Sequence, residues 1–128
     1  MVGEVLEGIV VAGLGEGTYF MSIEHYKKEI KEKLGFDAYP GTLNIETDKE
    51  NIDSLKKLNP IIISGFKKGD KTFGGVNCYN AKIEDIDGAI IIPEINKHKE
   101  DIIEFISTVH VKSKLNIKDG DKIKIEIK

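Results

Sequence analysis

The 128-residue sequence contains one cysteine, no tryptophan and three prolines. Because a disulfide needs two thiols and a cysteine-type zinc cluster needs several, the single Cys78 excludes both kinds of site within the chain. No apolar run is long enough to cross a membrane, and residues 1–13 carry two glutamates but no basic segment typical of a signal peptide. We therefore expect a protein of the reducing cytoplasm.

A strong excess of charge is also lacking. The 19 basic and 22 acidic side chains give a formal net charge of −3, so we expect no general affinity for nucleic acid. Hydrophobic residues make up 40% of the chain and charged residues 32%, which is typical of a globular protein. The length fits one domain over residues 1–128, and we expect a monomer that binds neither nucleic acid nor a membrane.

Hydrophobic patterns predict a chain made mainly of β-strands. Strands are predicted at residues 5–12, 39–47, 60–66, 72–84, 88–93 and 116–128, with turns at 67–71 and at the start of the last segment and a break at Gly74–Gly75. The run 88–93 is apolar throughout, which predicts a strand buried on both faces.

Apolar stripes predict three helices, at residues 22–34, 50–58 and 98–107. The first has Ser22 as its cap and Gly35 at its end, with Tyr26, Ile30 and Leu34 inward. The second has Ile52, Leu55 and Leu58 inward, and the third has Ile102, Ile103 and Ile106 inward. About six strands with two or three helices over the openings predict a small closed β-barrel.

Three glycines lie within five positions directly after the first predicted strand, at Gly13, Gly15 and Gly17. Such a segment exposes backbone N–H groups that can approach a polyphosphate closely. It is not a Walker A motif, because no Gly-Lys-Ser/Thr follows, and it lacks the spacing of a dinucleotide-binding βαβ unit. The alternative is a tight turn without a ligand, and in a nucleotide site Glu16 must point away from the phosphates.

Thr42 and Asn44 are separated by one residue on a predicted strand, so both side chains emerge on one face. Leu43 and Ile45 then face the core. Hydroxyl and amide oxygens suit Mg²⁺, which keeps several waters and takes most of its charge compensation from substrate phosphates. The alternative is an ordinary solvated strand face.

Several segments, in this order and spacing, resemble the archaeal CTP-dependent riboflavin kinases: GLGEGTYF, LGFDAYPGTLNIE, FGGV, DGAIIIP and LNIKDGDKIKI. The resemblance runs from about residue 4 to residue 127. It implies a six-stranded cradle-loop barrel that transfers the γ-phosphate of CTP to the 5′-hydroxyl of riboflavin and releases FMN and CDP. It also implies Mg²⁺ as cofactor.

The same resemblance implies roles for individual residues. Nucleotide contacts are implied at Gly13, Leu14, Gly15, Glu16, Gly17 and Thr18, and in a second segment at Val109, His110, Val111 and Lys112. Mg²⁺ ligands are implied at Thr42 and Asn44, and flavin contacts at Asn96 and Glu104. Glu104 lies on the predicted helix 98–107, where an ordinary surface glutamate is the alternative. As a kinase residue it would orient or deprotonate the 5′-hydroxyl.

The segment Val109–Lys112 departs from the family, which often has a proline near it and Asn-Leu-Arg after it. Lys112 keeps the charge of an arginine but not its planar fork, which bears on the preference for CTP. An isolated histidine such as His110 is more often structural or exposed than a ligand. Two other functions therefore stay open: a flavin- or nucleotide-binding barrel without turnover, and a non-enzymatic regulatory barrel, which the lack of a basic stripe disfavours.

Overall fold

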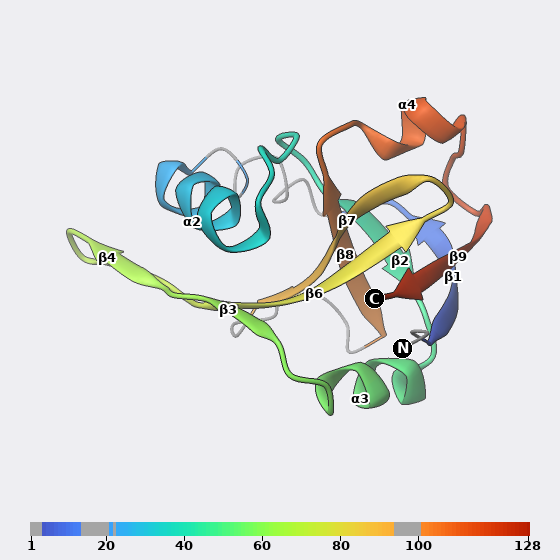
Figure 1. Cartoon of the computed structure of the whole chain (residues 1–128), viewed down its shortest axis with the longest axis horizontal. Coiled ribbons are helices and arrows are strands. Elements are labelled where there is room, and N and C mark those ends of the chain that lie inside the picture. The colour runs from blue at the N-terminus through green and yellow to red at the C-terminus, as the bar shows by residue number, and fades with distance from the viewer. Residues whose placement is uncertain (1–3, 14–20, 22, 94–100) are drawn as a thin grey trace.

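The computed structural model of the chain describes residues 4–13, 21, 23–93 and 101–128. These residues form a mainly β structure, a closed six-stranded antiparallel barrel with three helices around it (Figure 1). The predicted fold class is confirmed. No helix within these ranges has the length and apolar character that a membrane span requires.

The barrel strands follow the order β6–β7–β8–β2–β1–β9, and the barrel closes where β9 pairs with β6. Their bounds are β1 Val5–Val11, β2 Leu43–Glu46, β6 Val76–Ile83, β7 Ile86–Pro93, β8 Ile102–Ser107 and β9 Lys122–Ile127. Strand β3 (Ile61–Ile63) pairs with β6 outside the closed ring. Strands β4 (Phe66–Lys68) and β5 (Lys71–Phe73) form a separate hairpin that projects from the barrel (Figure 1).

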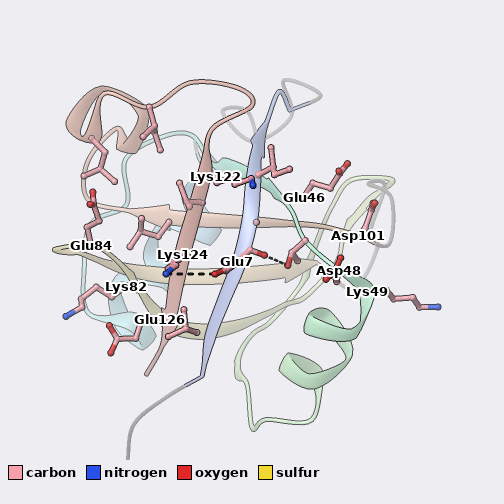
Figure 2. Close-up of a pocket in the computed structure, with 18 residues that line it drawn as sticks. Glu7, Glu46, Asp48, Lys49, Lys82, Glu84, Asp101, Lys122, Lys124 and Glu126 are labelled. Atoms are coloured by element: carbon pink, nitrogen blue, oxygen red, sulfur yellow. Dashed lines mark hydrogen bonds and ion pairs between the residues drawn. The ribbon is translucent and has the colours of Figure 1, made fainter.

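Strands β1 and β9 turn alternate side chains toward the barrel core and toward solvent. In β9 the buried residues Ile123, Ile125 and Ile127 face the core, as the alternation predicts. On the outer face, Lys124 of β9 lies opposite Glu7 of β1, with 3.9 Å between Nζ and Oε1 (Figure 2). This side of the sheet therefore needs no covering helix.

Strands β6, β7 and β8 are instead covered on both faces. Their inward side chains join the barrel core, while Cys78, Ala89 and Ile106 join a second cluster under α2 (Glu24–Leu34). The predicted burial of the segment 88–93 is confirmed for Gly88–Ile91, and its last two residues are half-buried. Burial also raises the pKa of the Cys78 thiol to about 12.

Helices α3 (Lys49–Lys56) and α4 (Val111–Leu115) lie at opposite ends of the barrel (Figure 1). Ile52 and Leu55 of α3 and Val111 of α4 all pack into the barrel core, so the two helices close its openings. Leu58, predicted to face inward, lies beyond α3 and is 41% exposed. Helix α4 was not predicted, because five residues are too few for an apolar period to show.

The predicted helix at 98–107 is wrong where the structure describes it, because Ile102–Ser107 forms strand β8. The isoleucines at 102, 103 and 106 have helical spacing, and the strand hides its own period of two since both of its faces are buried. The predicted strand 60–66 divides into β3 and the start of β4. The predicted cap Ser22 lies outside the described residues, whereas Gly35 ends α2 as expected, with a φ of 83°.

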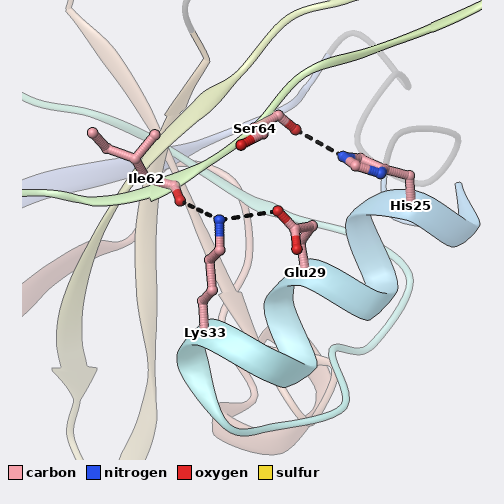
Figure 3. A network of polar contacts seen from close by, with 5 residues as sticks. All are labelled: His25, Glu29, Lys33, Ile62 and Ser64. Atoms are coloured by element: carbon pink, nitrogen blue, oxygen red, sulfur yellow. Dashed lines mark hydrogen bonds and ion pairs between the residues drawn. The ribbon is translucent and has the colours of Figure 1, made fainter.

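Helix α2 also makes polar contacts with the edge of β3 that faces away from β6 (Figure 3). Lys33 Nζ donates to the carbonyl oxygen of Ile62 at 2.9 Å and lies 3.0 Å from Glu29 Oε1. The ring nitrogen Nε2 of His25 lies 2.8 Å from the carbonyl oxygen of Ser64. These three side chains, four residues apart on one helical face, provide polar partners for the open edge of the sheet.

Candidate functional site

Three polar residues from two distant parts of the sequence meet where β1, β2 and β8 lie side by side. Asn44 of β2 is the ladder partner of Val11 in β1 and of Glu104 in β8. Leu43 and Ile45 face the barrel core, so Asn44 points to the opposite face of the strand, as the sequence predicts. Thr42, just before the strand, donates from Oγ1 to Glu104 Oε1 at 2.9 Å.

This group of residues is not a solvated strand face. Asn44 is 9% exposed and Glu104 is 7% exposed, and they belong to the few buried polar residues in the described part of the chain. Glu104 lies on a strand rather than on a helix, so the reading of it as a surface glutamate is also wrong. Buried polar side chains of this kind are retained when something satisfies them.

The carboxamide oxygen Oδ1 of Asn44 is buried and has no hydrogen-bond partner in the structure. Gly13, the first of the three glycines, lies against the same carboxamide. A Cβ atom built on Gly13 would overlap the side-chain nitrogen of Asn44 and lie 2.9 Å from its Cγ. Gly13 is therefore required for the close approach of Asn44, a reason that the sequence pattern did not reveal.

A pocket of about 270 Å³ opens beside this group. Its lining includes the predicted residues Gly13, Thr42, Asn44, Val109, His110, Val111 and Lys112. The structure thus brings one end of the glycine segment, both predicted metal ligands and the second predicted nucleotide segment to one place. The remaining predicted residues, Leu14, Gly15, Glu16, Gly17, Thr18 and Asn96, lie outside the described residues.

Sequence reasoning missed other residues that line this pocket, among them Tyr39, Phe105 and Ser107. The rings of Tyr39 and His110 are tilted toward each other with 5.2 Å between their centroids. The backbone N–H of Tyr39 donates to the carbonyl oxygen of Ser107 at 2.7 Å, which fixes the turn before Thr42. The sequence did offer a signal for Tyr39, because this residue directly precedes the turn at Pro-Gly and turns often carry functional side chains.

Lys112 lies in the short helix α4, and His110 occupies the N-terminal cap position of that helix. Lys112 Nζ pairs with Asp119 Oδ1 at 2.7 Å, and both side chains are substantially exposed. His110 Nδ1 lies 2.6 Å from Ser113 Oγ. An exposed ion pair contributes about 0–1 kcal/mol to stability. The pairing with Asp119 therefore orients Lys112 but does not prevent its ammonium group from binding another anion.

A larger hollow of about 1040 Å³ lies over the outer face of β1 and β9 (Figure 2). It is lined by charged side chains of both signs, including the exposed pair of Glu7 and Lys124. It contains none of the residues predicted to bind a ligand, and a mixed-charge exposed surface does not select an anionic substrate. The smaller pocket is therefore the candidate site.

The donor set around Asn44 and Thr42 fits a hard divalent cation. An amide oxygen without a partner and a threonine oxygen whose hydrogen is already donated both offer lone pairs, and Mg²⁺ prefers oxygen ligands. Among the described residues no group of three or more His, Cys, Asp and Glu side chains is arranged to hold a metal, so a softer metal such as zinc has no such cluster there.

The sequence also matches known proteins over most of its length. A family model named CTP-dep_RFKase, with the description "Domain of unknown function DUF120", matches residues 10–127. The chain is 46% identical over 125 residues to a riboflavin kinase of Pyrobaculum islandicum, covering 95% of this chain and 59% of that protein. It is 45% identical over 125 residues to a riboflavin kinase of Methanococcoides burtonii, covering 95% and 56%. It is 46% identical over 124 residues to a riboflavin kinase of Pyrococcus furiosus, covering 95% and 58%. The chain spans about six tenths of the length of these curated relatives.

Proposed function

The chain belongs to the archaeal CTP-dependent riboflavin kinase family, and from this we propose that it phosphorylates riboflavin with CTP as donor and Mg²⁺ as cofactor. The observation that carries the proposal is the meeting of Gly13, Thr42, Asn44 and the segment 109–112 around one pocket beside Glu104. The reaction itself is inferred from family membership. The pocket supplies residues of the types that this chemistry needs.

The reaction joins the 5′-oxygen of riboflavin to the γ-phosphorus of CTP and breaks the bond between that phosphorus and the β–γ bridging oxygen, releasing CDP. Phosphoryl transfer asks little covalent chemistry of a protein, so positioning and charge neutralisation dominate. We assign nucleotide binding to residues 13–18 and 109–112. Backbone N–H groups of the glycine segment would face the phosphates, and Lys112 would add the one positive charge among the described residues of the pocket.

Thr42 and Asn44 would hold Mg²⁺ through Oγ1 and Oδ1. When bound, the cation neutralises charge on the β- and γ-phosphates. Because both ligands are neutral, the cation needs the nucleotide phosphates as further ligands. This explains why two uncharged side chains are adequate for a kinase site.

Riboflavin is assigned to the side of the site that Asn96 and Glu104 would contact. Glu104 would orient the 5′-hydroxyl or take its proton as the new bond to phosphorus forms. Its place on strand β8, rather than on a loop, gives that carboxylate a fixed position relative to Asn44.

One assay tests the assignment. The protein is incubated with riboflavin, Mg²⁺ and CTP, ATP, GTP or UTP in turn, and FMN is measured by chromatography. We expect FMN with CTP, much less with ATP, and none after EDTA. Equal rates with ATP and CTP would show that the donor assignment is wrong. Binding of riboflavin and CTP without any FMN would favour the alternative of a binding barrel without turnover.

A further inference from the structure

We propose that Glu104 is a positioning residue of the cation site and acts on the cation through the hydroxyl of Thr42. This inference rests on the proposed function, because it takes Thr42 and Asn44 as the ligands of Mg²⁺. It gives Glu104 a role in addition to its assignment on the flavin side. The observation behind it is the 2.9 Å hydrogen bond from Thr42 Oγ1 to Glu104 Oε1.

The direction of this hydrogen bond decides how Thr42 meets a cation. A threonine hydroxyl has one hydrogen and two lone pairs, and its hydrogen rotates to the best acceptor. The carboxylate of Glu104 is that acceptor, so the hydrogen points toward β8 and the lone pairs stay available to a cation. Without the carboxylate the hydroxyl would turn freely and would meet a cation with its hydrogen in part of its orientations. Partners of this kind around a metal ligand typically affect metal affinity or activity by about 10–100-fold.

The placement of Glu104 supports an action through Thr42. Thr42 and Asn44 line the pocket, whereas Glu104 is not among the described residues that do so and is only 7% exposed. Its Cα is the ladder partner of Asn44, which puts both side chains on the same face of adjacent strands. Glu104 is also the ladder partner of Ile91 in β7, so two backbone ladders hold it beside the two ligands.

Charge supports the same conclusion. Removing a carboxylate from water is costly, and positive charge or hydrogen-bond donors nearby reduce that cost. A divalent cation held by Thr42 and Asn44 would lie one hydrogen bond away from Glu104. The carboxylate would in turn supply negative charge that the two neutral ligands lack. Cation and carboxylate should therefore stabilise each other.

The test measures binding of Mn²⁺, as a spectroscopic substitute for Mg²⁺, by electron paramagnetic resonance in the presence of saturating CDP. The variants are Glu104→Gln, Thr42→Val and the double variant. Thr42→Ser keeps the hydroxyl, and Glu46→Gln is the matched control because Glu46 lies on the same strand as Asn44 but is exposed. Riboflavin affinity is measured for each variant by quenching of flavin fluorescence.

We expect Glu104→Gln and Thr42→Val each to weaken Mn²⁺ binding about 10–100-fold. The double variant should lose little more than Thr42→Val alone, because Glu104 is proposed to act on the cation through the hydroxyl that Thr42→Val removes. Thr42→Ser should retain more Mn²⁺ affinity than Thr42→Val because it keeps the hydroxyl, and Glu46→Gln should bind Mn²⁺ like the parent. In turnover, Glu104→Gln should raise the Mg²⁺ concentration needed for half-maximal rate.

Two results would overturn the inference: unchanged Mn²⁺ affinity in Glu104→Gln, or losses that multiply in the double variant. If Glu104→Gln does not fold, Glu104→Asp gives the same test, because it keeps the charge but draws the carboxylate back from Thr42. A parent protein that binds Mn²⁺ with CDP but forms no FMN would refute the proposed kinase activity and leave this inference standing. A parent that forms FMN while Glu104→Gln binds Mn²⁺ normally would refute the inference alone. A parent that binds no Mn²⁺ with CDP and forms no FMN would refute both.

Discussion

Gly13 is a position where a sequence pattern cannot distinguish three possible reasons for a glycine. A glycine at the end of β1 can serve a bound phosphate, a turn, or the close approach of another side chain. The structure identifies the last of these, because the carboxamide of Asn44 occupies the space where a Cβ of Gly13 would lie. The position of Asn44 therefore depends on the absence of a side chain at residue 13.

This dependence gives a prediction for Gly13→Ala. The added methyl should push the Asn44 carboxamide away from its present position, and we expect the rate of FMN formation at limiting Mg²⁺ to fall at least about tenfold. The melting temperature is measured in parallel by circular dichroism.

The double variant Gly13→Ala/Asn44→Ala provides the control. It removes the clash, so it should melt at a higher temperature than Gly13→Ala while forming FMN no faster at limiting Mg²⁺. Full activity of Gly13→Ala at every Mg²⁺ concentration would show that Asn44 does not need this space.

Single residues of the site could be predicted to different extents. Thr42 and Asn44 could be predicted as a pair, because the period of a strand places residues two apart on one face. The partner of Thr42 could not, because Glu104 is 62 positions away and pairing between distant strands leaves no local pattern. Glu104 was named only through family resemblance, and the helix predicted around it was wrong.

Among the elements, the strands with one solvent face were predictable, and of the three strands covered on both faces β6 and β7 were predicted while β8 was not. β1 and β9 are recognisable by alternation, and α2 by its apolar stripe and its terminal glycine. β8 has isoleucines on both faces, so a helical period fits its sequence equally well. Helix α2 covers the outer face of β8, and the sequence alone did not predict that these two elements pack together.

The polar contacts between α2 and β3 give a prediction at this scale. Lys33→Met removes both the ion pair with Glu29 and the hydrogen bond to Ile62 (Figure 3). We expect the free energy of unfolding at pH 7 to fall by about 1 kcal/mol. Lys31→Met is the matched control, because Lys31 lies on the same helix and pairs only with the highly exposed Asp37 among the interactions described. Its effect should stay within about 0.5 kcal/mol.

The same variant has a defined pH dependence. The hydrogen bond from Lys33 is the largest cause that lowers the pKa of Glu29 below its ordinary value of 4.5. A lowered folded-state pKa contributes stability that is present above the unfolded-state pKa and is lost as the pH falls through the folded-state pKa. The difference between parent and Lys33→Met, measured by urea unfolding, should therefore shrink below pH 4.5. A constant difference down to pH 3 would show that the ion pair with Glu29 contributes nothing.

In the whole molecule, the barrel topology assembles the site from three distant parts of the chain. The residues after β1 contribute Gly13, the turn before β2 contributes Thr42, and β8 with the start of α4 contributes Glu104 and residues 109–112. The chain has no arginine, so any phosphate in this pocket meets lysine and backbone N–H groups rather than a planar guanidinium. The barrel itself was predictable from its strand content, but the meeting of these segments required the strand order.

The antiparallel pairing of β1 with β9 has a consequence for the connectivity of the chain. Ile127 donates its backbone N–H to the carbonyl oxygen of Glu4 at 2.8 Å, so the first described residue lies beside the end of β9. β1 then runs from Glu4 toward the pocket at Gly13, which places this junction at the opposite end of the barrel. A circular permutant is therefore feasible, with a short glycine–serine linker between the old ends and new ends in the exposed turn at Gly69 and Asp70. We expect it to fold and to form FMN at nearly the parental rate, as measured by circular dichroism and by the riboflavin assay. A permutant that folds but forms no FMN would show that the β4–β5 hairpin takes part in the reaction.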